Sequence, residues 1–419
     1  ESRSSRDNPK ADWYVWADRK ADGTPPNNWL SVFGGPSWQW DTHRGQYFLH
    51  NFLVQQPDLN LHNPEVQEAV LGAMRFWLER GVDGFRLDAI NFGMHDPSLA
   101  DNPPAADPSM SEQPLSNPYA YQAHIHDKSR PELLPFLARI RTLLDEFGAT
   151  TSLAEVGDGK DRSLQLMSDY AGGASRLHMA YGFDFLGATF TPAFVRSTVE
   201  RYERLAGEAW PCWAFSNHDC IRHVSRWSRR EEDRATIARL AFAVLLALRG
   251  SICLYQGEEL GLPEADIAFE DLQDPAGKAF WPEYKGRDGC RTPMPWADRA
   301  PNAGFGGGKP WLPVSPAHLP LSVAHQAADA DSVLAFYRKA IGVRQASEAL
   351  RLGAIEILEA SDSVLALRRS HGGRAVVCLF NFGAAPVAAD LHGGGAVLLS
   401  SGPDKSAQIE PFGFRWLEA

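Results

Sequence analysis

Four segments of this chain that have the pattern of helices are each followed, after a short loop, by a segment with the pattern of a buried strand. The predicted pairs are helix 62–81 with strand 82–90, helix 131–148 with strand 150–156, helix 190–207 with strand 211–219, and helix 229–250 with strand 251–260. Because helices that alternate with apolar strands usually cover both faces of a parallel sheet, the pattern indicates an α/β fold. Polar residues gather at the carboxyl end of each strand, where (β/α)8 barrels build their active sites. The sequence therefore predicts a (β/α)8 (TIM) barrel.

The two ends of the chain have patterns of their own. Residues 1–52 are irregular and rich in Trp, Gly and Pro. The predicted barrel covers 53–346 and includes a long Gly-, Pro- and Trp-rich insertion at about 260–325, after which helix 331–347 closes it. From 347 to 419 short strands alternate with glycine turns, which predicts a C-terminal antiparallel β-domain of the sandwich type.

The stretch GFRLDAINF (84–92) carries a charged pair inside an apolar strand. Since side chains alternate between the two faces of a strand, Arg86 and Asp88 point the same way. Opposite charges on a buried face are costly unless they are paired or used. Taken alone, the pair fits a structural ion pair as well as a functional one.

Three carboxylates, Asp88, Glu155 and Asp219, fall at the carboxyl ends of three predicted strands and are expected to converge on one rim. Converging carboxylates either bind a hard cation or perform acid–base and nucleophilic work on a glycosidic bond. Arg86 favours the second interpretation, because a guanidinium keeps Asp88 ionised, as a nucleophile requires. His218 can donate hydrogen bonds to sugar hydroxyls, although a lone histidine is more often structural.

Composition and net charge restrict the classes of molecule that this protein is expected to bind. The net charge of −11 argues against nucleic acid and anionic membranes as partners. The 13 Trp, 22 Phe and 10 Tyr residues suit stacking against sugar rings, or else a large aromatic core. No apolar run approaches a membrane span, and the first residues lack a signal-peptide pattern. The five cysteines lack metal-ligand spacing and read as free thiols, so we expect a cytoplasmic location and no metal site.

Five ordered segments together resemble the α-amylase superfamily, glycoside hydrolase family 13, in its α-glucosidase/oligo-1,6-glucosidase branch. GFRLDAINF is similar to the nucleophile segment, AEVGD (154–158) to the acid/base segment, and FSNHDCIR (215–222) to the segment of the transition-state-stabilising Asp. QPDLN (56–60) resembles the branch marker near the end of domain B. GRDGCRTPMPW (286–296) resembles the segment after strand eight whose arginine contacts the non-reducing sugar.

The resemblance implies a role for each matching residue. Asp88 is expected to be the nucleophile, Glu155 the general acid/base, and Arg86 the support of Asp88. Asp219 and His218 are expected to hold the hydroxyls of the glucose being cleaved.

Two further assignments rest on the same segments. Arg287 is the expected sugar-contacting arginine, with Arg291 as the alternative. Phe52, just before QPDLN, is expected to line the pocket wall; a core position is the alternative.

The implied activity is that of a retaining α-glucosidase. It would hydrolyse short α-1,4-linked, maltose-type oligosaccharides from the non-reducing end through a covalent glucosyl-enzyme intermediate, with transglucosylation. Ala89 favours α-1,4 bonds, since relatives that prefer α-1,6 bonds tend to carry Val there; packing against the barrel wall is the alternative role. An oligo-1,6-glucosidase, a trehalose synthase or a sucrose isomerase remain alternatives. A non-catalytic interaction module is disfavoured by the three carboxylates.

The start of the chain departs from the family pattern. Members begin with three βα units, whereas residues 1–18 resemble the segment that comes after those units, so we expect the first quarter of the barrel to be absent. Residues 1–52 would then be the remainder of domain B, and the missing segment would be a separate chain or lie outside this sequence. No cofactor is expected to be required, and a structural calcium ion near the first βα loop, which some relatives keep, would fall in that missing part.

Overall fold

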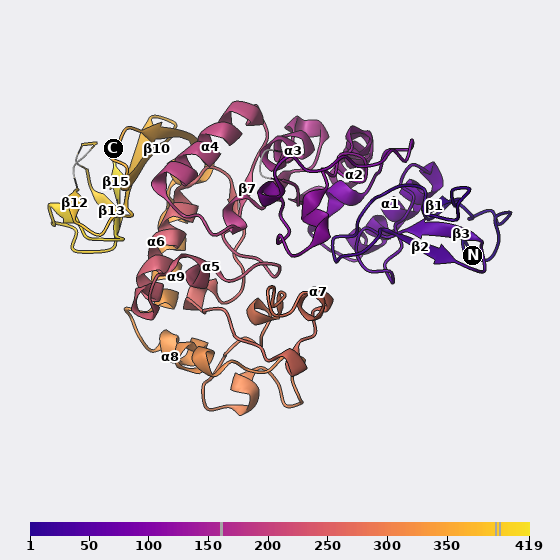
Figure 1. The fold of residues 1–419 in the computed structure, drawn as a ribbon. Helices are drawn as coiled ribbons and strands as arrows, with labels where there is room; N and C mark the ends of the chain where they lie inside the picture. Colours follow the sequence, from indigo (N-terminus) through magenta and orange to yellow (C-terminus); the bar gives the residue numbers. More distant parts are fainter. Residues whose placement is uncertain (160–161, 390–391, 394) are drawn as a thin grey trace. The chain divides into compact units, whose positions relative to one another are not determined.

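The computed structural model describes residues 1–159, 162–389, 392–393 and 395–419 (Figure 1). These residues form two compact units. The first comprises Glu1–Phe183 and Leu205–Pro211, and the second comprises Asp184–Arg204 and Cys212–Ala419.

The first unit begins with a small antiparallel sheet. Its strands β1 (Trp16–Ala17), β2 (Trp38–Asp41) and β3 (Gln46–Leu49) are arranged in the order β1-β3-β2. Trp29 and Trp38 stack in its core with ring centroids 6.0 Å apart. The sequence predicted an irregular segment here, because strands of two to four residues are too short to show an alternating pattern.

A parallel sheet forms the centre of the first unit. Strands β4 (Gly84–Leu87), β5 (Thr151–Val156) and β6 (Met179–Gly182) lie side by side in that order. A Cβ atom at Gly84 would lie 2.1 Å from the Thr151 carbonyl oxygen, so glycine permits the close approach of β4 and β5. Strand β4 ends at Leu87, earlier than predicted, which places Asp88 in the turn that comes next.

Each strand of this sheet is preceded along the chain by a helix. These helices are α1 (Pro64–Leu78), α2 (Leu134–Asp145) and α3 (Ser163–Tyr170). The side chain of Asn63 accepts a hydrogen bond from the Glu65 N–H, and Pro64 occupies the first turn, so α1 begins close to the start of the helix predicted over 62–81. The pair of α3 and β6 was not predicted. Its helix has eight residues and its strand four, which leaves little periodic signal.

The second unit contains the two-stranded parallel sheet of β7 (Cys212–Trp213) and β8 (Ser251–Ile252). Both strands are much shorter than predicted, because the polar residues after them turn into loops. The helices of the second half of the chain are α4 (Pro192–Ala206), α5 (His223–Trp227), α6 (Arg234–Ala247), α7 (Pro275–Ala279), α8 (Val323–Ala327), α9 (Val333–Ala346) and α10 (Glu348–Leu352). Phe242 of α6 stacks on Tyr337 of α9 with centroids 3.6 Å apart, which packs these two helices together.

The predicted antiparallel C-terminal domain is confirmed. Strands β9 (Ala354–Leu358), β10 (Val364–His371), β11 (Arg374–Asn381), β13 (Val397–Ser400) and β15 (Phe414–Glu418) form one sheet in the order β13-β15-β11-β10-β9. Strands β12 (Val387–Ala388) and β14 (Gln408–Ile409) pair separately.

One buried arginine fastens this sheet to α6 within the second unit. The guanidinium of Arg369 donates to the carbonyls of Ala247 (2.9 Å) and Leu248 (2.8 Å), at the end of α6, and to that of Gly353 (2.7 Å). It thereby satisfies carbonyls that have no partner within a helix end. Among the described residues, none of the helices has the length and apolar character needed to cross a membrane.

Candidate active site

The end of β4 presents the predicted pair of charges. Arg86 Nη1 donates to Asp88 Oδ1 at 2.7 Å, and the Asp88 side chain is 73% exposed. Ala89, the next residue, has a positive φ of 42° and precedes the 3-10 helix η1 (Ile90–Phe92). The chain therefore turns sharply at Asp88 and presents its carboxylate beyond the end of the sheet.

Glu155 lies at the end of the neighbouring strand β5 and is almost fully buried, with 3% exposure. Its Oε2 accepts a hydrogen bond from the Ala89 N–H (3.0 Å), and its Oε1 lies 2.7 Å from Arg86 Nη2. Arg86 thus contacts both carboxylates. The structure brings three of the predicted site residues, Asp88, Glu155 and Arg86, into one cluster.

The environment of Glu155 favours its protonated form. Burial, followed by the contact with the Asp88 carboxyl, raises the pKa of Glu155 to about 7, against the opposing effect of Tyr181 and Arg86. A carboxyl that holds a proton near neutral pH, beside one that is paired with an arginine, supplies an acid and an anion in the same site.

Tyr181 on β6 is a site residue that the sequence analysis missed. It is paired in register with Glu155, its hydroxyl donates to Glu155 Oε1 (2.7 Å), and it accepts from Arg86 Nη2 (3.1 Å). Burial and the nearby Glu155 charge raise the pKa of Tyr181, so the phenol keeps its proton. The available signal was the short aromatic stretch HMAYGFDF (178–185), which comes after a segment with helical spacing.

A second cluster lies in the second unit, around Asp219. Asp219 Oδ1 accepts from Arg287 Nη1 (2.9 Å) and from Arg291 Nη2 (2.6 Å). Arg291 Nε also donates to the His218 carbonyl (2.6 Å), and His218 Nε2 lies 3.4 Å from Asp219 Oδ2. The structure therefore brings both candidate arginines to the same carboxylate.

Asp274, in the insertion, is the missed partner of this second cluster. Its two oxygens accept from Arg287 Nε (2.9 Å) and Nη2 (3.0 Å), a bidentate pair. Burial alone would raise the pKa of Asp274, but the bonds from Arg287 lower it below its usual value. Its signal in the sequence is that of a helix cap, since Asp274 precedes Pro275 and its side chain accepts from the Ala276 N–H.

Phe52 lies in an aromatic group of the first unit. It is half-buried, and its ring centroid lies 5.0 Å from that of Phe92 and 5.8 Å from that of Phe33. Phe92 belongs to η1, so this group adjoins the turn that carries Asp88. In the QPDLN segment, Asp58 accepts from the side chain and the N–H of Asn51, which closes the loop after β3.

The predicted site residues thus form two clusters, each described within its own unit. Asp88, Glu155 and Arg86 gather in the first, and Asp219, His218, Arg287 and Arg291 in the second. Among the residues that the structure describes, no group of three or more His, Cys, Asp and Glu side chains is arranged to hold a metal ion.

Comparison with known proteins defines the class. A model of the α-amylase catalytic domain matches residues 1–353, and a model of a domain of unknown function (DUF3459) matches residues 352–411. The chain therefore belongs to the α-amylase family of glycoside hydrolases, and it is an enzyme of that class. The family's catalytic domain is a (β/α)8 barrel, so the predicted fold class is confirmed.

Individual relatives carry glucosidase names. A probable α-glucosidase of Rhizobium meliloti (strain 1021) is 56% identical over 384 residues, which cover 91% of this chain and 69% of the relative. An oligo-1,6-glucosidase of Heyndrickxia coagulans is 32% identical over 393 residues, which cover 85% of this chain and 68% of the relative.

Solved structures add an α-glucosyl transfer enzyme and a trehalulose synthase. An α-glucosyl transfer enzyme matches with a TM-score of 0.93 and 49% identity, over 100% of this chain and 79% of that chain. The trehalulose synthase from Pseudomonas mesoacidophila MX-45 matches with a TM-score of 0.85 and 29% identity, over 100% of this chain and 79% of that chain. The names of these relatives support an activity of glycoside hydrolysis or glucosyl transfer for this chain.

Proposed function

We propose that the protein carrying this chain is a retaining α-glucosidase. It would release glucose from the non-reducing end of short, maltose-type α-1,4-linked oligosaccharides and transfer part of that glucose to other acceptors. The observation that carries the proposal is the pairing of a protonatable Glu155 with an Asp88 carboxylate that is bound to Arg86. Enzymes that retain the anomeric configuration need this combination of an acid and a nucleophile.

The reaction can be derived from these two groups. The Asp88 carboxylate attacks the anomeric carbon of the terminal glucose, and the bond from that carbon to the glycosidic oxygen breaks. Glu155 gives its proton to the departing oxygen. The ionised Glu155 then takes a proton from water, whose oxygen attacks the anomeric carbon and releases Asp88. If an acceptor sugar or alcohol replaces this water, the product is a new glucoside.

The second cluster is assigned to substrate recognition. The Asp219 side chain is bound by two guanidinium groups, which fix its orientation and so suit it to accept hydrogen bonds from glucose hydroxyls. His218 would donate to a neighbouring hydroxyl. Arg287 remains the proposed sugar-contacting arginine, with Arg291 as the alternative, and Phe52 the proposed wall of the pocket.

Linkage preference is assigned to Ala89. Its N–H is bound to Glu155, so its side chain starts beside the acid that protonates the leaving oxygen. A small methyl group at this point leaves room for the secondary oxygen of an α-1,4 bond. The names of the relatives, α-glucosidase and oligo-1,6-glucosidase, are compatible with either linkage. The proposed preference for maltose therefore rests on Ala89.

Glucosyl transfer is the second candidate function, favoured by the match to an α-glucosyl transfer enzyme at 49% identity. A single experiment separates the candidates: proton NMR of the products from maltose, isomaltose, sucrose and trehalose. The proposal expects glucose from maltose, released first as the α-anomer, with smaller amounts of transfer products. Initial β-glucose would contradict retention, and conversion of sucrose or maltose into an isomer without net hydrolysis would favour an isomerase.

A further inference from the structure

One buried serine joins the turns that come after Asp88 and Glu155. Ser129 lies in the loop before α2, with a positive φ of 56°. Its Oγ donates to Asp158 Oδ2 (2.6 Å) and accepts from Asn91 Nδ2 (3.1 Å), and its N–H donates to the Asn91 carbonyl (2.6 Å). Asn91 lies three residues after Asp88, and Asp158 three residues after Glu155. Ser129 therefore links the two turns through short hydrogen bonds.

Lys128 adds a buried charge to the same junction. Its side chain is 2% exposed, and its Nζ lies 2.6 Å from Glu112 Oε1 and 3.7 Å from Asp158 Oδ1. Nζ also donates to the carbonyl of Gly157, two residues after Glu155, at 3.4 Å. Burying an ammonium group is costly unless it is paired, and apolar packing would anchor a loop at a lower cost. The charge is therefore placed where it holds the turn after Glu155.

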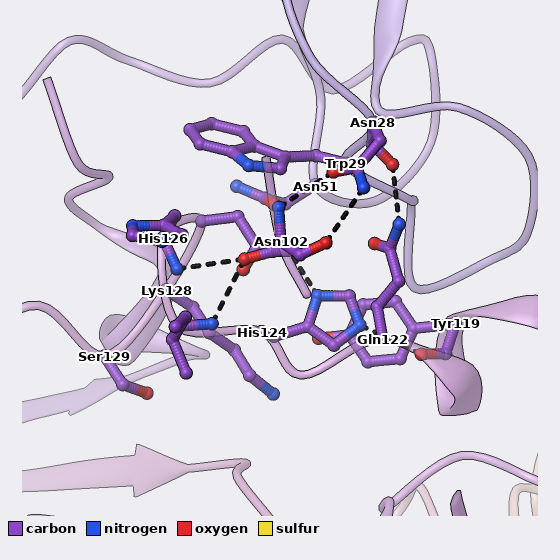
Figure 2. A network of polar contacts seen from close by, with 12 residues as sticks. Asn28, Trp29, Asn51, Asn102, Tyr119, Gln122, His124, His126, Lys128 and Ser129 are labelled. Atoms are coloured by element: carbon purple, nitrogen blue, oxygen red, sulfur yellow. Dashed lines mark hydrogen bonds and ion pairs between the residues drawn. The ribbon is translucent and has the colours of Figure 1, made fainter. Parts of the chain in front are cut away.

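The loop that precedes Lys128 is itself held in place by hydrogen bonds to other segments of the first unit. Figure 2 shows Asn102 at the centre of the polar contacts that hold this loop. Its Oδ1 accepts from the N–H groups of Ile125 (3.2 Å) and His126 (3.1 Å), and its own N–H donates to Asn28 Oδ1 (2.8 Å). The segment before Lys128 thus has little freedom to shift, which makes it a fixed support.

We infer that Lys128 and Ser129 are positioning residues that set the spacing between the carboxyl groups of Asp88 and Glu155. The inference rests on the proposed function, because it assigns those carboxyls their catalytic roles. The bond from the Ala89 N–H to Glu155 joins the two turns at the sheet, and the Ser129 junction joins the same turns three residues further along. Two separate links of this kind fix a distance that a single link would leave free to vary.

Two substrates distinguish a change in the spacing of the Asp88 and Glu155 carboxyl groups from a general loss of activity. Cleavage of maltose requires attack by Asp88 and proton donation by Glu155 in the same step. Cleavage of α-glucosyl fluoride requires the attack but not the proton, since fluoride leaves as an anion. The ratio of kcat/KM for maltose to kcat/KM for α-glucosyl fluoride therefore reports whether the two carboxyls are correctly placed relative to each other.

The experiment measures this ratio for Ser129→Ala and for the matched control Ser152→Ala. Ser152 is fully buried on the same strand as Glu155 and is hydrogen-bonded twice to His178, so its loss costs a comparable number of contacts. A displacement of about 1 Å can cost about a hundredfold in rate, so we expect Ser129→Ala to lower the ratio by about tenfold or more. Ser152→Ala should leave the ratio unchanged, even where the melting temperature falls.

A second variant keeps the test decisive if Ser129→Ala does not fold. Asp158→Asn preserves the shape of the side chain and removes the charge opposite Lys128, and it should lower the ratio in the same direction. An unchanged ratio in whichever variant folds, with both substrates losing activity equally, would overturn the positioning role and leave the α-glucosidase proposal standing. An unmodified protein that cleaves neither substrate would instead remove the basis of both.

Discussion

Tyr181 and Glu155 are paired in register on neighbouring parallel strands, and the phenol hydroxyl donates a hydrogen bond of 2.7 Å to the carboxyl oxygen. This bond stabilises the ionised form of Glu155, whereas burial and Asp88 stabilise the protonated form. The balance of these contacts sets the pH at which the proposed acid loses its proton. The bond also brings β6, a strand that the sequence analysis did not predict, into the site.

Removal of this hydrogen bond should move the pH profile. Because Tyr181 lowers the pKa of Glu155, Tyr181→Phe should raise that pKa and shift the basic limb of kcat/KM on maltose to higher pH. The measurement is a pH–rate profile of both proteins between pH 5 and about 9, a range that brackets the unperturbed and raised pKa values of a carboxyl. A shift to lower pH would show that the bond favours the protonated acid instead.

Loss of the acid should abolish the basic limb altogether. In the unmodified protein, kcat/KM on maltose should fall as the pH rises through about 7, where Glu155 ionises. Glu155→Gln should lower activity on maltose by about a hundredfold or more, because general acid catalysis contributes that much. The kcat/KM for α-glucosyl fluoride should be largely retained, because fluoride leaves without a proton, whereas its kcat should fall, because Glu155 is also the base of the second step. If Glu155→Gln kept the basic limb, another group would be the acid.

The ion pair between the buried Asp274 and the partly exposed Arg287 should contribute to stability. Replacing Asp274 by Asn leaves the Arg287 guanidinium without its bidentate partner, at a cost of about 3 kcal/mol in unfolding free energy measured with urea. The control is Asp266→Asn, which removes the exposed ion pair with Lys285 and should cost less than about 1 kcal/mol. Because Arg287 lowers the pKa of Asp274, the difference should shrink as acid protonates that carboxyl. Equal losses of unfolding free energy in the two variants would mean that Asp274 stabilises the protein no more than the exposed Asp266 does.

Ala89→Val tests the proposed linkage preference. The steric effect of the added methyl groups is about 1–3 kcal/mol, enough to change the ratio of kcat/KM on maltose to that on isomaltose by tenfold or more in favour of isomaltose. Ala89 has a positive φ, which a β-branched residue tolerates poorly, so the melting temperature should fall as well. Ala89→Ser serves as the control at the same backbone position. A parent protein that already prefers isomaltose, or an unmoved ratio in Ala89→Val, would exclude Ala89 as the selector.

The sequence located the strand ends better than it located their surroundings. Asp88 and Glu155 could be found because each comes after an apolar strand that is preceded by a long amphipathic helix. Tyr181 could not, since β6 has only four residues and α3 eight, too few for a periodic pattern. Asp274 carries the local signal of a helix cap, and its contact with Arg287, 13 residues later, depends on a loop conformation that no local pattern encodes. The Ser129 junction joins three segments and was equally invisible to local reasoning.

The central claim is that Asp88 forms a covalent bond to glucose, and trapping of that intermediate tests it most directly. A 5-fluoro-α-glucosyl fluoride should form the intermediate readily and release it slowly, so that the labelled peptide can be identified by mass spectrometry after digestion. We predict a single fluoroglucosyl label on Asp88, and no label in Asp88→Ala. A label on another carboxylate, or steady turnover of this reagent without a covalent adduct, would contradict the proposed mechanism.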